Sequence, residues 1–95
     1  MFIVNLTYKV PLETVDRFLE QHVAYLNEQY QLGNFHAFGR KVPRDGGVIL
    51  SLVSDKNELL QILAKDPFKM NDLADYELTE FMPSKTCDEL AFLMK

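Results

Sequence analysis

Apolar and polar residues alternate along residues 2–8, FIVNLTY, with the period of two that is typical of a β-strand. Three later segments, each rich in β-branched or aromatic residues, predict further strands at residues 34–42, 47–54 and 75–83. The positions of the first strand that share its strongly apolar face, which we expect to be buried, are Phe2, Val4, Leu6 and Tyr8.

Residues 12–32 repeat their apolar positions at the spacing of an α-helix. Pro11 suits the first turn of such a helix, and Gly33 followed by Asn34 is a common helix end. The segment therefore predicts one long helix. The residues that share a narrow arc of it are Val15, Leu19, His22 and Leu26.

A shorter segment, residues 54–65, predicts a second helix. Asp55 is placed to cap its N-terminus, and Glu58 follows three residues later, as in a capping box. The same pattern returns near the C-terminus at Thr86 and Glu89, so the tail is expected to form a short third helix.

The order of the elements is strand, helix, strand, strand, helix, strand, followed by the helical tail. RDGG, residues 44–47, carries the Asp-Gly signal of a tight hairpin between the second and third strands. Residues 66–74 connect the second helix to the last strand as a helical turn or loop. This order is that of the ferredoxin-like split βαβ fold (βαββαβ), an α+β fold whose four-stranded antiparallel sheet has its helices on one face.

The first and third strands also carry apolar residues on the face that the helices leave open. A large uncovered apolar sheet face is rare on a monomer. We therefore expect a two-fold homodimer, with the sheets packed face to face or the tails exchanged.

Composition narrows the class of protein further. A chain of 95 residues has room for a single domain, spanning residues 1–95. Its net charge of −4, from 10 basic and 14 acidic residues, argues against a general nucleic-acid binder. The single cysteine, Cys87, excludes an internal disulfide and fits a reducing compartment, so we expect a cytoplasmic protein. The apolar N-terminal segment is too short to cross a bilayer, so no membrane association is expected.

The centre of the long helix raises a chemical question, because His22 lies in the middle of its apolar stripe. Burying an unpaired polar group costs about 1–3 kcal/mol, so the imidazole needs a partner. One interpretation is a core histidine that is hydrogen-bonded to a carbonyl or a nearby side chain. The other is a general acid or base whose tautomer is fixed by a carboxylate.

A candidate carboxylate occurs in KDPF, residues 65–68. Asp66 before Pro67 matches a helix N-cap followed by proline at the first helical position. The alternative is that Asp66 orients His22, because the two helices of this topology lie side by side on the sheet. The two interpretations are compatible.

Two further groups of residues are candidates for ligand binding. Three cations surround the predicted hairpin, where they form either a solvated loop or the mouth of a pocket for an anionic substrate: Arg40, Lys41 and Arg44. Five aromatic residues form either plain core or the walls of a cavity for a planar ligand: Tyr8, Tyr25, Phe35, Phe38 and Phe68.

Several kinds of chemistry lack their motifs in this sequence. There is no glycine-rich nucleotide-phosphate loop and no signature of a serine or cysteine nucleophile. His22, His36, Asp66 and Cys87 show no metal-ligand spacing. We therefore expect neither a cofactor nor a metal.

Four features together resemble the YCII-related (YciI-like) family over about residues 1–85. They are the histidine of the long helix, the Pro-Arg-x-Gly-Gly hairpin, the Asp-Pro-Phe segment, and the closing Tyr-x-x-x-Glu-Phe-x-Pro. The resemblance implies a ferredoxin-like domain of the dimeric α-β barrel type. It also implies an active site built from a histidine and an aspartate, which correspond to His22 and Asp66.

Relatives of this fold include muconolactone isomerase-like enzymes and a dehydrochlorinase that acts on chlorinated hydroxyquinols. The chain departs from the family at Gly39–Arg40, where many members have Gly-Pro. This departure alters the shape and charge of the pocket mouth, so the resemblance does not carry over a substrate.

Two functions follow from these observations. The first is a cofactor-independent lyase or isomerase that acts on a small cyclic metabolite, with His22 and Asp66 as its acid–base dyad. The alternative is a non-catalytic dimeric module for small-ligand binding or scaffolding; the apolar tail ELAFLM also suggests a subunit of a larger complex. The residues expected to bind the substrate are Tyr8, Tyr25, Arg40 and Phe68.

Overall fold

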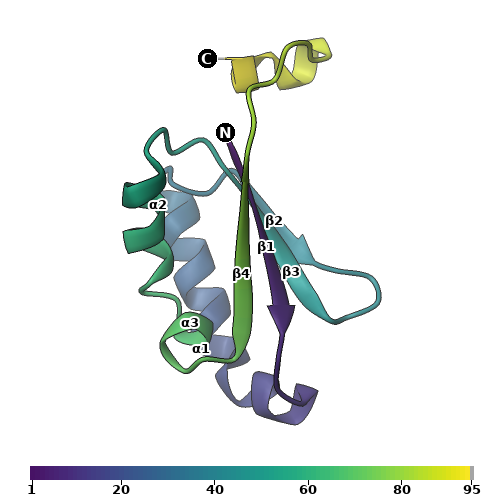
Figure 1. Cartoon of the computed structure of the whole chain (residues 1–95), viewed down its shortest axis with the longest axis vertical. Coiled ribbons are helices and arrows are strands. Elements are labelled where there is room, and N and C mark those ends of the chain that lie inside the picture. The colour runs from purple at the N-terminus through teal and green to yellow at the C-terminus, as the bar shows by residue number, and fades with distance from the viewer. Residues whose placement is uncertain (95) are drawn as a thin grey trace.

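Four antiparallel strands form one sheet in the order β2–β3–β1–β4 (Figure 1). The structure is a computed structural model and describes residues 1–94. The predicted ferredoxin-like α+β fold, with its βαββαβ order, is confirmed. The strands are β1 (Phe2–Tyr8), β2 (Ala37–Arg40), β3 (Gly46–Ser51) and β4 (Ala74–Glu80).

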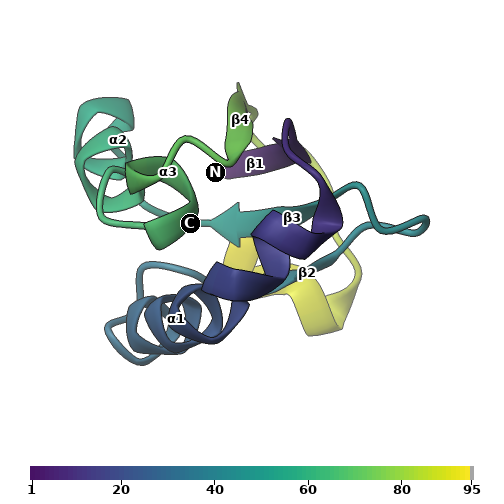
Figure 2. The same ribbon diagram turned by 90° about the horizontal axis from the view of Figure 1, so that it is seen from below.

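Three helices, α1 (Leu12–Gln31), α2 (Lys56–Leu63) and α3 (Pro67–Met70), lie on the same side of the sheet in both views (Figures 1 and 2). Gly33 ends α1 with a positive φ of 82°, which glycine adopts without a steric penalty. Asp55 caps α2 by accepting a hydrogen bond from the Asn57 amide. Pro11 precedes α1 as its N-cap rather than belonging to its first turn.

The main core lies between β1 and the helices. The side chains of Phe2, Val4 and Leu6 are buried there, as the alternation of β1 predicts. Burying one such side chain fully stabilises the fold by about 1.5–3 kcal/mol. A second, smaller core cluster packs α3 against α1; its buried members are Val15, Phe68 and Leu73.

The connection between β2 and β3 differs from the predicted tight hairpin. A loop of residues 41–45 joins the strands, and the Lys41 amide donates to the Gly46 carbonyl across it. Gly46 is the first residue of β3. Its backbone passes so close to β1 that a Cβ would lie 1.8 Å from the Leu6 carbonyl oxygen. The glycine of the Asp-Gly pair thus allows a close backbone approach in the sheet, and the turn lies before it.

The tail forms a 3₁₀-helix, η1 (Asp88–Met94), in place of the predicted capped helix that starts at Thr86. It lies beyond the end of β4, on the side where the N-terminus emerges (Figure 1). Leu93 is buried, whereas Phe92 and Met94 are exposed. This segment is separate from the layer of helices that covers the sheet.

The other face of the sheet carries no helix among residues 1–94, and Ile3, Val48 and Leu50 lie on it. Val48 is 39% exposed. This is the apolar face that motivates the expected homodimer. No helix within residues 1–94 combines the length and the hydropathy needed to cross a membrane.

Candidate active site

A pocket of about 290 Å³ opens between α1 and three of the four strands, β1, β2 and β3. His22 and Leu19 of α1 form part of its wall. Leu19 is 36% exposed, although it belongs to the apolar arc of α1, because its side chain borders this pocket and does not pack in the core. The other lining residues of the pocket include Leu6, Tyr8, Phe38, Arg40, Gly47, Ile49 and Phe68.

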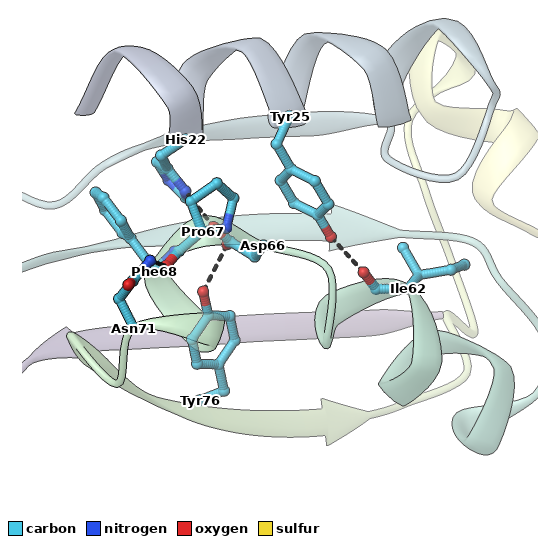
Figure 3. A network of polar contacts seen from close by, with 8 residues as sticks. All are labelled: His22, Tyr25, Ile62, Asp66, Pro67, Phe68, Asn71 and Tyr76. Atoms are coloured by element: carbon cyan, nitrogen blue, oxygen red, sulfur yellow. Dashed lines mark hydrogen bonds and ion pairs between the residues drawn. The ribbon is translucent and has the colours of Figure 1, made fainter. Parts of the chain in front are cut away.

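His22 forms a hydrogen bond to Asp66 at the wall of this pocket (Figure 3). Its Nδ1 lies 2.7 Å from Asp66 Oδ1, and the two side chains are 10% and 0% exposed. An ionised carboxylate can only accept hydrogen bonds, so Nδ1 carries a proton. Nε2 is then the nitrogen of His22 that can exchange a proton with a ligand.

Asp66 is held by two further donors. Its Oδ1 also accepts from the Phe68 amide at 2.9 Å, which makes Asp66 the N-cap of α3, as the Asp-Pro pattern predicts. Its Oδ2 accepts from the Tyr76 hydroxyl at 2.5 Å. One buried carboxylate therefore joins α1, α3 and β4, and it serves both as the predicted helix cap and as the partner of the histidine.

Tyr76 is the polar residue that sequence reasoning missed. It lies on β4 between the exposed residues Asp75 and Glu77, on the face that β1 turns toward the helices. Burial, together with the negative charge of Asp66, raises the pKa of the Tyr76 phenol above its ordinary value. The hydroxyl therefore stays protonated and keeps donating to Asp66 at neutral pH.

Phe68 restricts the orientation of the His22 imidazole by stacking on it. Its ring stacks on the His22 ring with centroids 3.7 Å apart and planes 4° from parallel. Tyr8 meets Phe68 edge to face at 5.9 Å. Hydrogen bonding to Asp66 and stacking on Phe68 together restrict the orientation of His22 before any ligand binds.

Three of the four residues predicted to bind a substrate, Tyr8, Arg40 and Phe68, line the same pocket as His22. Tyr25 does not. Its hydroxyl donates to the Ile62 carbonyl at 2.6 Å, and its ring borders a separate hollow between α1 and the segment that joins α2 to α3. Burial is the main cause that raises the pKa of Tyr25, and the negative charges of Asp66 and Glu28 raise it further.

The three cations near the hairpin have different surroundings. Lys41 donates to the Thr7 hydroxyl at 3.1 Å, and Arg44 forms an ion pair with Asp16 at 2.5 Å. Arg40 alone of the three lines the pocket. Within residues 1–94, no cluster of three or more His, Cys, Asp or Glu side chains is placed to hold a metal ion.

These features define a small α+β domain of ferredoxin-like topology with a buried histidine–aspartate pair at an apolar pocket. Residues 1–82 match the model of the YCII-related domain family, and the chain belongs to that family. No curated protein matches the sequence.

Among solved structures, the chain is similar to the 5-chloro-2-hydroxyhydroquinone dehydrochlorinase of Burkholderia phenoliruptrix, in complex with 2,5-dihydroxybenzoquinone. The two are 15% identical, with a TM-score of 0.70 over 85% of this chain and 93% of that chain. At this identity the likeness shows a shared fold.

Proposed function

We propose that the protein is an acid–base enzyme, a lyase or isomerase that acts on a small cyclic metabolite, with His22 as its catalytic residue. The observation that carries the proposal is the buried His22–Asp66 hydrogen bond at the wall of an apolar pocket. Asp66 orients the imidazole and stabilises its protonated form, while Tyr76 holds Asp66.

The proposed step moves one proton through His22 Nε2. In an isomerase, Nε2 removes a proton from one ring position and returns it at another. In a lyase, it removes the proton, the electron pair of that bond forms the new double bond, and the leaving group departs as an anion; His22 then passes the proton to that anion or to water, which restores the neutral imidazole. Neither step needs a redox partner, and both leave His22 unchanged after turnover.

The size of the pocket and the fold comparison support a cyclic ligand. At about 290 Å³ the pocket suits a single ring, since the pockets that bind drug-sized ligands measure about 300–1,000 Å³. The dehydrochlorinase with the shared fold is named for a six-membered-ring substrate and is in complex with a quinone. These two points support the class of ligand and leave the particular compound open.

The test is a screen of hydroxylated quinols, cyclic enones and lactones, each as the neutral ring and as a ring that carries a carboxylate, with products separated by chromatography. For any compound turned over, His22→Gln is expected to lower kcat by about 10²–10⁴-fold, the usual contribution of general acid–base catalysis. His36→Gln is the matched control, because His36 lies outside the pocket and its Nδ1 accepts from the Leu52 amide.

A His22→Gln variant that is folded and as active as the wild type overturns the proposal. Compounds that bind in the pocket without any turnover favour the alternative, a non-catalytic ligand-binding module. The homodimer and the cytoplasmic location remain predictions; light scattering of the purified chain tests the first, and cell fractionation the second.

A further inference from the structure

We propose that the ligand of this pocket is an anion, a ring that carries a carboxylate or a comparable acidic group, and that Arg40 binds that group. The inference rests on the proposed function in using the same pocket, and it adds the charge class of the ligand. Its basis is the position of Arg40 in the sheet, its surroundings, and the apolar character of the remaining walls.

The register of the strands directs Arg40 toward the pocket. Arg40 pairs with Gly47, Gly47 with Leu6, and Leu6 with Tyr76. These four residues form one row across the face of the sheet that the helices cover, because Leu6 of that row is buried against the helices. Arg40 thus lies at the β2 end of the row, and Tyr76, which holds Asp66, lies at the β4 end.

Gly47 leaves space between the two ends of the row. Strands in a sheet are about 4.8 Å apart, so the α-carbons of Arg40 and Leu6 are separated by about 10 Å. The intervening residue has no side chain, and Gly47 lines the pocket floor. His22 forms the opposite wall from α1. A single ring over Gly47 therefore has the imidazole on one side and the guanidinium on the other.

Charge singles out Arg40 among the cations nearby. Lys41 and Arg44 are engaged by Thr7 and Asp16, as described above. Within residues 1–94, no Asp or Glu forms an ion pair with Arg40. Arg40 is the one residue with a permanent charge among those that line the pocket, and a guanidinium matches a carboxylate with two parallel hydrogen bonds.

The apolar walls define the rest of the ligand. Leu6, Phe38 and Ile49 line the pocket, and the Phe68 ring stacks on His22 at its edge. Such walls favour a flat hydrocarbon ring and offer few hydrogen-bond partners to a sugar. The combination fits a cyclic acid better than a neutral quinol or lactone.

The experiment compares benzoate with benzamide, two probes of the same ring and similar size that differ in charge. NMR titration of the ¹⁵N-labelled full chain gives both affinities, and the shifted amides locate the site. In the wild type, benzoate is expected to bind about tenfold more tightly than benzamide and to shift the amides of Phe38, Gly47 and His22.

Arg40→Gln is expected to lower the affinity for benzoate about tenfold and to leave benzamide unchanged. Arg40→Lys should retain part of the preference, because the charge remains while the two-pronged geometry is lost. Lys41→Gln is the matched control: it removes the same unit of charge from the next residue, whose side chain contacts Thr7. Its affinity for benzoate should equal that of the wild type.

Equal binding of benzoate and benzamide by the wild type overturns the inference. An equal loss of benzoate affinity in Arg40→Gln and Lys41→Gln also overturns it, because it would indicate only a general attraction between the anion and positive charge. So does the absence of benzoate binding in the pocket at millimolar concentration. These outcomes are separate from the fate of the proposed function. Turnover of neutral rings alone supports the proposed function and speaks against the anion site. Benzoate binding with no turnover of any acid supports the anion site and speaks against the proposed function.

Discussion

The row of residues Arg40, Gly47, Leu6 and Tyr76 has polar groups at its two ends, and their surroundings are opposite. At the β4 end, the Tyr76 hydroxyl reaches a fully buried carboxylate that accepts hydrogen bonds from three donors. At the β2 end, Arg40 is exposed and lines an open pocket. A satisfied buried network makes a region rigid, while an exposed cation remains available to a ligand. Under the proposals above, the β4 end sets the geometry of the site and the β2 end selects the ligand.

The sharpest way to break the β4 end is Asp66→Leu. The substitution leaves the His22 ring, the Phe68 amide and the Tyr76 hydroxyl without their acceptor. We expect the free energy of unfolding to fall by about 3–5 kcal/mol, as when one partner of a buried pair is removed. Urea denaturation measures it. Because that loss is large for a domain of this size, Asp66→Asn, which keeps one acceptor oxygen, provides a second measurement and should lose less. A loss below about 1 kcal/mol for Asp66→Leu contradicts the account.

A smaller effect distinguishes the two buried tyrosines. Tyr76→Phe removes a hydrogen bond to a carboxylate and should cost about 2 kcal/mol, whereas Tyr25→Phe removes one to a backbone carbonyl and should cost about 1 kcal/mol. Only the first should also change the NMR signals of the His22 imidazole, because only Tyr76 donates to Asp66. Equal changes at His22 in both variants would remove Tyr76 from the network.

Alkaline pH offers a further test of the same two residues. Both phenols have their pKa raised on folding, Tyr76 by burial and Asp66, and Tyr25 chiefly by burial. The unfolded chain therefore loses these protons first, so the stabilisation is complete below about pH 10 and declines as the pH rises above it. Each tyrosine contributes a slope of at most about 1.4 kcal/mol per pH unit. In each Tyr→Phe variant, the free energy of unfolding measured with urea should decline less steeply above about pH 10. An unchanged slope in both variants contradicts this linkage.

The smallest effect is expected at the β2 end. Arg40→Gln should change the free energy of unfolding by no more than about 0.5 kcal/mol, because the side chain is exposed and has no acidic partner among residues 1–94. Thermal and urea unfolding measure it. A loss comparable with that of Tyr76→Phe would show that Arg40 is structural and would remove the contrast between the two ends.

The β4 end was largely predictable from the sequence, because its residues sit in strong local patterns. The 3.6-residue period places His22 on the buried face of α1, and the Asp-Pro pair places Asp66 at a helix start. Tyr76 was missed because a tyrosine that alternates with Asp75 and Glu77 is what any half-buried strand contains. Its partner is ten residues away in the chain, and no local pattern marks a contact of that kind.

The β2 end was harder to predict because it depends on the register of the hairpin. A two-residue turn at Asp45–Gly46 would pair Arg44 with Gly47 and, further along, Arg40 with Ser51. The actual loop of residues 41–45 pairs Arg40 with Gly47 and so places the guanidinium beside the open floor of the pocket. The sequence alone could not choose among Arg40, Lys41 and Arg44, since their surroundings follow from this register and from contacts on other elements.

The double use of Asp66 bears on how this domain changes over generations. A family member that loses the proposed chemistry can replace His22, but it still needs an acceptor for the Phe68 amide at the start of α3. Asp66 is therefore expected to outlast His22. Under the proposed function, a descendant that retains the aspartate without the histidine has kept the fold and lost the reaction, so His22 would distinguish active members of the family from inactive ones.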